Sequence, residues 1–127
     1  MTSVAIVGGS GYTGGELLRF LLNHSQARVT QITSRDSAGQ FVYATHPHLR
    51  GGTDLRFIHP DALEPCDAIF LCLPHGVASR DIERYAALAP VIVDLSADFR
   101  LRDAGLYQTY YDTAHAAPAW LDRFVYG

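Results

Sequence analysis

The sequence predicts an α/β domain built on a doubly wound parallel sheet, and three observations favour this class. Short apolar runs of strand length alternate with helical or turn segments, as in strand–helix–strand units with right-handed connections. The runs are almost wholly apolar, as expected of parallel strands covered on both faces. A glycine-rich loop leads from the first run directly into the first helix. With 127 residues, the chain has the length of one ordinary domain.

The first half of the sheet is predicted from residues 3–33. Residues 3–7 form an apolar strand, residues 13–23 a helix and residues 29–33 a second strand. The leucines of the helix recur at helical spacing and form one stripe, namely Leu17, Leu18, Leu21 and Leu22. Residues 34–54 lack this periodicity and contain three glycines and a proline, which predicts a long, partly irregular connection near the ligand-binding edge.

The second half continues the alternation. The expected elements are a short strand at 55–58, a helical turn at 60–64 and strands at 67–73 and 91–95. A helix is expected to begin near Val77 and to end before Pro90. Its predicted buried face consists of Ala78, Ile82, Tyr85, Ala86 and Ala89. The aromatic residues of 101–127 predict that this segment packs against another surface.

Composition and charge exclude several classes of protein. Hydrophobic residues make up 48% of the chain, which is enough for a core and excludes a disordered segment. The formal net charge of −3 gives no overall attraction to nucleic acid or to an anionic membrane, so neither partner is expected. No run approaches the ~18–20 apolar residues of a membrane span, and no secretory leader is recognisable, so a cytoplasmic protein is expected.

Rare or absent residue types exclude several chemistries within this stretch. All ten basic residues are arginines, so the chain has no Schiff-base lysine, no P-loop lysine and no lysine to partner a catalytic tyrosine. Cys66 and Cys72 are the only cysteines, and both fall in or beside an apolar strand. They are predicted to be reduced core thiols and not a disulfide.

Three glycines follow the first predicted strand with the spacing Gly8-x-x-Gly11-x-x-Gly14. Between a strand and a helix, such glycines allow a sharp turn, a close approach of backbone N–H groups to a pyrophosphate and tight helix packing. The pattern predicts a Rossmann-type domain with a dinucleotide at the helix N-terminus; the alternatives are a structural turn and, for Thr13, a helix N-cap. The loop residues predicted to contact the cofactor are Gly8, Ser10, Gly11, Tyr12, Thr13 and Gly14.

The end of the second predicted strand indicates which dinucleotide binds. In NAD-binding domains, an acidic residue about 20 positions after the glycines binds the ribose 2′-hydroxyl. Here Ser34 lies 20 positions after Gly14, and Arg35 follows it. A hydroxyl and a guanidinium suit a 2′-phosphate, which predicts NADP in preference to NAD. The side chain of Asp36 is expected to turn away while main-chain amides of residues 34–36 approach the phosphate.

Further candidate residues lie at the ends of the later strands. Leu73, Pro74 and His75 are predicted to lie against the nicotinamide ribose; His75 is interpreted as a loop residue, with an acid or base role as the alternative. Ser96 and Arg100 are candidates to face an anionic substrate.

Two metal sites can be imagined from the sequence. One would use His46, His48 and His59, and the other Asp94 and Asp98. The histidines lack a carboxylate or cysteine to complete a ligand set, and the aspartates are better explained as a strand end that shapes the site. No metal is therefore predicted.

On these residues the chain resembles the N-acetyl-γ-glutamyl-phosphate reductase family, including its lysine-biosynthesis branch, which reduces aminoadipyl phosphate held on an amino-group carrier protein. The most specific match is the run Asp-Leu-Ser-Ala-Asp-Phe-Arg at 94–100, and the middle third leans toward the carrier-protein branch. The matching stretches are 8–17, 33–35, 46–51, 73–77, 93–101, 106–111 and 124–127.

The resemblance implies a reductive dephosphorylation in arginine or lysine biosynthesis. A cysteine thiolate attacks the acyl phosphate, phosphate leaves, and NADPH delivers hydride to the thioester to release a semialdehyde. In the family, the nucleophilic cysteine and the catalytic histidine follow the Tyr126-Gly127 pair, so residues 1–127 are expected to be an NADP-binding domain truncated before the catalytic and substrate domain. Such a chain alone is expected to bind NADPH without turnover, and the full-length protein to be a homo-oligomer.

Two alternatives stay open. One is a non-catalytic NADP-binding or sensing module. The other is an atypical short-chain dehydrogenase, whose Tyr-x-x-x-Lys pair is absent here and which would not explain the match at 94–100. The residues encoded after Gly127 would distinguish an enzyme, with a Gly-Cys motif, from a binding module, with a stop codon.

Overall fold

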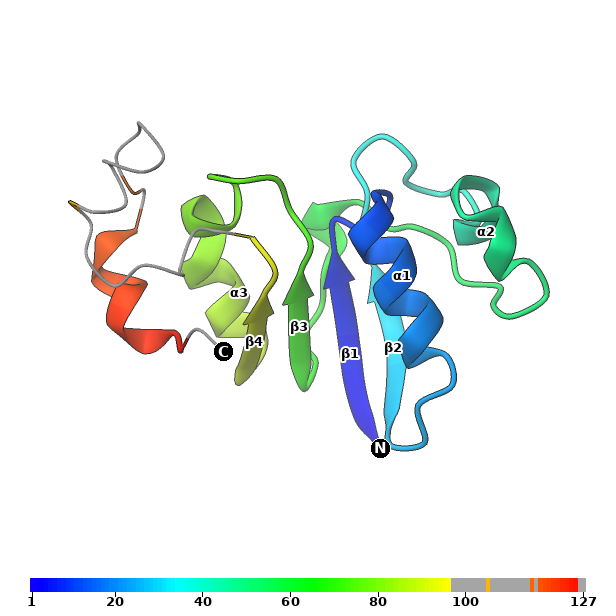
Figure 1. The fold of residues 1–127 in the computed structure, drawn as a ribbon, viewed down its shortest axis with the longest axis horizontal. Helices are drawn as coiled ribbons and strands as arrows, with labels where there is room; N and C mark the ends of the chain where they lie inside the picture. The colour runs from blue at the N-terminus through cyan, green and yellow to red at the C-terminus, as the bar shows by residue number, and fades with distance from the viewer. Residues whose placement is uncertain (97–104, 106–114, 116, 126–127) are drawn as a thin grey trace.

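A computed structural model of the chain describes residues 1–96, 105, 115 and 117–125. Four strands form one parallel sheet, namely β1 (Thr2–Val7), β2 (Ala27–Ile32), β3 (Ala68–Leu71) and β4 (Val91–Asp94). Their order is β2-β1-β3-β4, and Figure 1 shows the four arrows pointing the same way. The strands predicted at 3–7, 29–33, 67–73 and 91–95 are confirmed, with shifts of up to two residues at their ends.

Helices and 3-10 turns occupy the connections between these strands, and one 3-10 turn, η4, follows β4. In the described residues they are α1 (Tyr12–Leu21), α2 (Val42–Thr45), α3 (Ile82–Leu88), η1 (Pro47–Leu49), η2 (Pro60–Ala62), η3 (Ala78–Asp81) and η4 (Pro118–Arg123). The helix expected from Val77 thus begins as a 3-10 turn and becomes α-helical only at Ile82. None of the helices described is long and apolar enough to cross a membrane.

Each face of the sheet has its own hydrophobic core. On one face the buried side chains come from β1, β2, α1 and the connection after β2: Val4, Ile6, Leu18, Ile32 and Phe57. On the other face they come from β1, β3 and α3: Ala5, Val7, Ile69, Ile82 and Tyr85. Successive residues of β1 therefore serve opposite cores, as strand geometry requires. With α1 on one face and α3 on the other, the predicted doubly wound Rossmann-type fold is confirmed.

The prediction of a strand at 55–58 is wrong. Arg56 forms an isolated antiparallel bridge with Phe41, whereas Ile58 forms an isolated parallel bridge with Thr33. Each is a single bridge to a different segment, so residues 55–58 form no continuous ladder with either partner. The connection at 34–54, predicted as partly irregular, also contains α2 and η1, which are too short to produce a helical sequence period.

Part of the aromatic tail packs against the domain, as predicted. Leu121 is buried in the same core as Tyr85, and Trp120 and Phe124 pack against that core. The rest of residues 101–127, apart from Gly105, His115 and residues 117–125, lies outside the described part of the chain.

The direction of the strand order reverses between β1 and β3. From β1 the chain passes through α1 to β2 on one side, and from β2 it crosses to β3 on the other side of β1. The loops that follow β1 and β3 therefore leave in opposite directions. In open α/β sheets, ligands bind outside the carboxyl ends of the strands at such a reversal of strand order.

Candidate functional site

The turn from β1 into α1 is packed too tightly for side chains at three glycines, one of them Gly9, where a Cβ would lie 2.2 Å from Cγ1 of Ile32. Gly8 has a φ of +81°, and a Cβ there would lie 2.6 Å from the carbonyl oxygen of Cys72. A Cβ on Gly14 would lie 2.7 Å from the Cα of Gly9. At Gly11 the opposite holds, since no heavy atom lies within 4 Å of the position that a Cβ would take. The loop is therefore pressed against β3 and α1 but open above Gly11.

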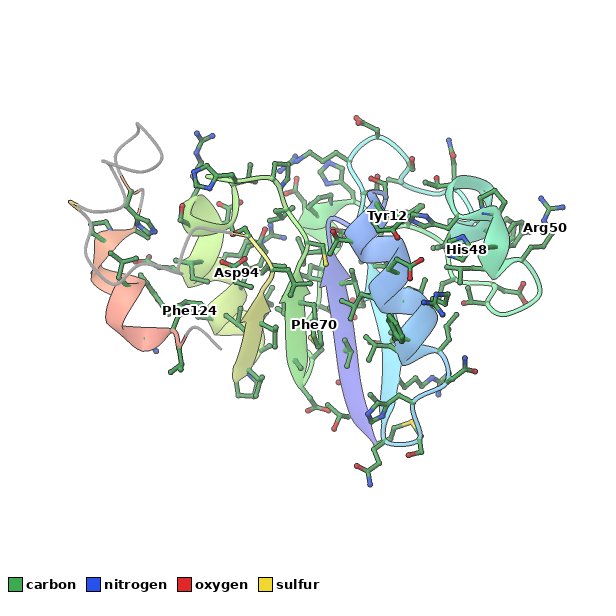
Figure 2. The ribbon with its side chains drawn as sticks, in the orientation of Figure 1. Tyr12, His48, Arg50, Phe70, Asp94 and Phe124 are labelled. Carbon is green, nitrogen blue, oxygen red and sulfur yellow. The ribbon has the colours of Figure 1, made fainter. Side chains whose placement is uncertain are left out.

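The N-terminus of α1 faces this open side. Gly11 is the N-cap residue, no side chain caps the helix, and its first turn contains no acidic residue. The role of Thr13 as a helix N-cap, considered above, is therefore wrong. Residues 10–13 are exposed, with Tyr12 84% exposed at the start of the helix (Figure 2).

Backbone donors gather at this helix end. Within the described part of the chain, the N–H groups of residues 10–13 donate to no other group. The first N–H groups of a helix have no intrahelical acceptor and carry the positive end of the helix dipole. Free donors beside open space form a site for a phosphate-type anion, so this loop fits the pyrophosphate of a dinucleotide.

Thr33 connects the end of β2 to the glycine loop. Its carbonyl oxygen accepts the N–H of Gly9 at 2.8 Å, and its Oγ1 accepts the N–H of Gly8 at 3.1 Å. The residues that follow Thr33 therefore begin beside the loop. Arg35 and Asp36 are exposed there, as a site for a ligand requires.

Ser34 is held more firmly than its two successors. It is buried, its N–H donates to the carbonyl oxygen of Ile58 at 3.0 Å, and its Oγ accepts the N–H of Ser37 at 3.2 Å. The hydroxyl thus orders the turn at 34–37 in which Arg35 and Asp36 lie.

The segment after β3 meets the same loop. A Cβ on Gly8 would lie 2.9 Å from Cδ2 of Leu73, so the Leu73 side chain packs directly on the glycine turn. Pro74 and His75 are exposed, and the carbonyl oxygen of Pro74 accepts the N–H of Val77 at 3.2 Å. The structure thus brings three predicted segments, 8–14, 34–36 and 73–75, to one edge of the sheet.

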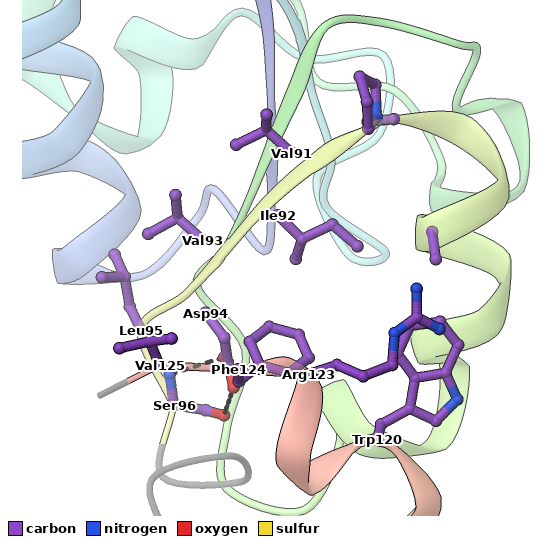
Figure 3. Close-up of a pocket in the computed structure, with 13 residues that line it drawn as sticks. Val91, Ile92, Val93, Asp94, Leu95, Ser96, Trp120, Arg123, Phe124 and Val125 are labelled. Atoms are coloured by element: carbon purple, nitrogen blue, oxygen red, sulfur yellow. Dashed lines mark hydrogen bonds between the residues drawn. The ribbon is translucent and has the colours of Figure 1, made fainter. Parts of the chain in front are cut away.

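Ser96 and Asp94 form a hydrogen-bonded pair at the end of β4. The N–H and the hydroxyl of Ser96 each donate to the Asp94 carboxylate at 2.9 Å (Figure 3). Both residues line a cavity of about 810 Å³ along β4, whose other walls include Val91, Trp120 and Phe124. The glycine loop does not contribute to this cavity. Arg100, the second residue predicted to face substrate, and Asp98 lie outside the described residues.

Both thiols are held in the neutral form. Burial, and to a smaller degree the charge of Asp94, raise the pKa of Cys72 to about 11. Burial likewise raises the pKa of Cys66, whose Sγ donates to the carbonyl oxygen of Ala68. Each thiol packs against one of the two cores, as predicted from the sequence.

The histidines considered for a metal site are occupied in other ways. Nε2 of the buried His46 lies 2.7 Å from the carbonyl oxygen of Gly9, and Nδ1 of His59 accepts the N–H of Asp61 at 3.1 Å. Across the residues described, no three His, Cys, Asp or Glu side chains are grouped so as to hold a metal ion.

The sequence did not indicate that Thr33 and His46 hold the glycine loop in place; His46 was considered only as a metal ligand. Both lie in stretches that match the resembled family, but a buried polar contact leaves no periodic pattern in a single sequence. The one signal for Thr33 was a hydroxyl residue at the end of an apolar strand. It placed Thr33 only within the matching stretch 33–35 and gave it no contact with the glycine loop.

Fold and site together define a dinucleotide-binding domain of the doubly wound α/β class. Residues 3–126 match the model of the family described as semialdehyde dehydrogenase, NAD binding domain. The chain belongs to this family.

Curated relatives agree with this assignment. The chain is 54% identical, over 127 residues and its whole length, to a putative LysW-L-2-aminoadipate 6-phosphate reductase of Thermomicrobium roseum, of which it covers 36%. It is 51% identical, over 98% of its length, to 36% of the LysW-L-2-aminoadipate 6-phosphate reductase of Deinococcus radiodurans. It is 47% identical, over its whole length, to 37% of the N-acetyl-gamma-glutamyl-phosphate reductase of Marinobacter nauticus. The chain thus spans about a third of the length of these relatives.

A solved structure has the same fold. Aspartate semialdehyde dehydrogenase with NADP from Candida albicans superposes with a TM-score of 0.64 at 21% identity, covering 82% of this chain and 32% of that one.

Proposed function

We propose that this chain is the NADP-binding part of a reductase that converts an N-blocked acyl phosphate into a semialdehyde in lysine or arginine biosynthesis. The observation that carries the proposal is the uncapped N-terminus of α1, open above Gly11, with Arg35 at the neighbouring end of β2. Family membership supports the nucleotide site, and the names of the relatives support the reaction.

Each of the three segments at the sheet edge has a part in binding. The N–H groups of residues 10–13 hold the pyrophosphate, while Gly8 and Gly14 let the loop approach it. Arg35, with the turn ordered by Ser34, binds the 2′-phosphate, and main-chain amides near Asp36 assist. Leu73, Pro74 and His75 lie toward the nicotinamide. When bound, NADPH supplies the hydride.

No residue of 1–127 is assigned as catalytic. The thiols of Cys66 and Cys72 are kept neutral by burial, which makes them poor nucleophiles. The nucleophile that the reaction requires would belong to the part of the relatives that this chain does not span. Ser96 and Arg100 remain candidates to face the acyl phosphate.

Within the two branches, we favour aminoadipyl phosphate carried on an amino-group carrier protein. The support is that the two relatives named for LysW share 54% and 51% identity with the chain, against 47% for the relative named for the N-acetyl substrate. A cytoplasmic location and a homo-oligomer of the full-length protein complete the proposal.

The test uses the protein at its natural length. We expect NADPH to bind at least about tenfold more tightly than NADH in a fluorescence titration, because a charged contact to the 2′-phosphate contributes roughly 1.5–3 kcal/mol. We expect kcat/KM for reduction to be higher with carrier-bound aminoadipyl phosphate than with N-acetyl-glutamyl phosphate. Tight NADPH binding without reduction of either substrate would support the non-catalytic binding module instead, and equal affinity for both cofactors would overturn the NADP assignment.

A further inference from the structure

We propose that His46 is a positioning residue for the cofactor: its Nε2–H holds the carbonyl group of Gly9 inward, so that the N–H of Ser10 points outward to the pyrophosphate. This inference rests on the proposed function, since it presumes that the glycine loop binds a dinucleotide.

The Gly9–Ser10 peptide is fixed by the contact with His46. Nε2 of His46 lies 2.7 Å from the carbonyl oxygen of Gly9, and both residues are buried. A carbonyl oxygen can only accept a hydrogen bond, so Nε2 must carry the proton. The peptide bond is trans and planar, so its N–H points opposite to its C=O. With the Gly9 carbonyl turned toward His46, the N–H of Ser10 is turned away from the protein, toward the exposed side of the loop.

The position of the imidazole ring is itself determined by its neighbours. A Cβ on Gly15 would lie 2.6 Å from Cε1 and from Nδ1 of His46, so the ring rests directly on the first turn of α1. Phe57 contacts it edge-on, with ring centroids 6.4 Å apart. His46 directly follows α2, and its backbone N–H donates to the carbonyl oxygen of Val42, the first residue of that helix. The ring thus joins the glycine loop, the first turn of α1 and the connection after β2.

Gly9 is held at both ends, and the two contacts have different consequences. Its N–H donates to the Thr33 carbonyl oxygen at 2.8 Å, which fixes where the loop begins. Its C=O bonds to His46, which fixes the direction of the next N–H along the chain. Without the histidine donor, the carbonyl would be buried without a partner, and rotation of the peptide toward solvent would relieve this at the expense of the Ser10 donor.

The experiment compares two amides that differ only in length. The amide nitrogen of His46→Gln can reach the place of Nε2, whereas that of His46→Asn reaches only the place of Nδ1. The dissociation constant for NADPH is measured well below the melting temperature of each variant, on the protein at its natural length. We expect the Gln variant to bind within about threefold of wild type and the Asn variant to bind about tenfold more weakly. A role in stability alone would lower both melting temperatures and leave both dissociation constants unchanged, which would overturn the proposal.

A second measurement needs no variant. Long-range ¹H–¹⁵N spectra of the wild-type histidine rings report which nitrogen carries the proton. We expect the Nε2–H form for His46 with and without NADPH; the neutral Nδ1–H form would overturn the proposal even if neither variant folds. Failure of wild-type protein to bind NADPH would instead overturn the proposed function.

Discussion

The amino ends of the strands and the glycine loop at their carboxyl ends differ in how their polar groups are paired. At the amino edge, Ser3 and Asp67 satisfy each other: the N–H and hydroxyl of Ser3 both donate to the Asp67 carboxylate, and the N–H of Asp67 donates back to the Ser3 hydroxyl. At the carboxyl edge, the N–H groups of residues 10–13 have no acceptor within the described part of the chain.

Polar groups at the amino ends of the strands are thus paired within the protein, whereas the N–H groups of residues 10–13 are the ones proposed to bind the cofactor. Water satisfies the exposed N–H groups at the start of a helix, and a phosphate-type anion can take the place of that water, as proposed for this loop. The carboxyl edge is nevertheless not loose. Thr33 and His46 hold the loop from behind, and this keeps the donors ordered while their acceptor sites stay open.

The largest effect is expected from a methyl group added on the packed side of the loop. Gly8→Ala forces a φ of +81° on alanine and places its Cβ 2.6 Å from the Cys72 carbonyl oxygen. Together these should destabilise the fold by about 2–4 kcal/mol, measured by urea denaturation.

Gly11→Ala is the matched control on the open side of the same loop. No atom lies within 4 Å of its added Cβ, and φ is −80°, so its stability should change by less than about 0.5 kcal/mol. NADPH affinity should fall about tenfold, because the methyl group occupies space that the ligand needs. Normal NADPH binding by Gly11→Ala would remove the distinction between the two sides of the loop.

The next effect concerns charge at the carboxyl edge. Arg35→Ala should weaken NADPH binding by about 10- to 150-fold, since hydrogen bonds to charged groups contribute roughly 1.5–3 kcal/mol, and should leave NADH binding nearly unchanged. Arg28→Ala, at the amino end of the same strand β2, is the control and should alter neither. Equal losses for both cofactors in parallel titrations would contradict a role at the 2′-phosphate.

The sequence predicted the layers of the fold but not the fine structure of the long connection. The apolar runs and the leucine stripe of α1 were sufficient because each obeys a period that burial imposes on strands or helices. Residues 55–58 carry the apolar side chains of a strand because Phe57 is buried in the core, although they make only isolated bridges to Phe41 and Thr33. At the site, the glycine spacing, Arg35 and the position of residues 73–75 after an apolar strand indicated the three segments that meet at this edge. The inward contact of His46 depends on tertiary packing across residues 9 and 46, and no local pattern encodes it.

A smaller effect is expected at the amino edge, where it should depend on pH. The backbone N–H of Ser3, followed by its hydroxyl, lowers the pKa of Asp67 below its ordinary value of 3.8. A carboxyl group with a lowered folded pKa adds stability above its unfolded pKa and loses it as the pH falls through the folded pKa. Asp67→Asn should therefore melt slightly below wild type at pH 7, and the gap should close as the pH falls below about 4. The exposed Asp54→Asn serves as control, and a gap independent of pH would contradict the role of the charge.

The last prediction, a reaction rate with no expected change in stability or cofactor affinity, tests whether the carboxyl edge carries any nucleophile of its own. Cys72 lies at this edge, with its N–H donating to the carbonyl oxygen of Val7, yet burial and the Asp94 charge raise its pKa to about 11. Against an ordinary thiol of pKa 9.0, this lowers the thiolate fraction at pH 8, and hence the alkylation rate by iodoacetamide, about 100-fold. Peptide mass spectrometry should find the rate still rising about tenfold per pH unit up to pH 9. An alkylation rate that reaches a plateau below pH 9 would mean that the Cys72 thiol ionises readily. The cofactor-binding part of the chain would then carry a reactive nucleophile, contrary to the proposal that the nucleophile lies outside residues 1–127.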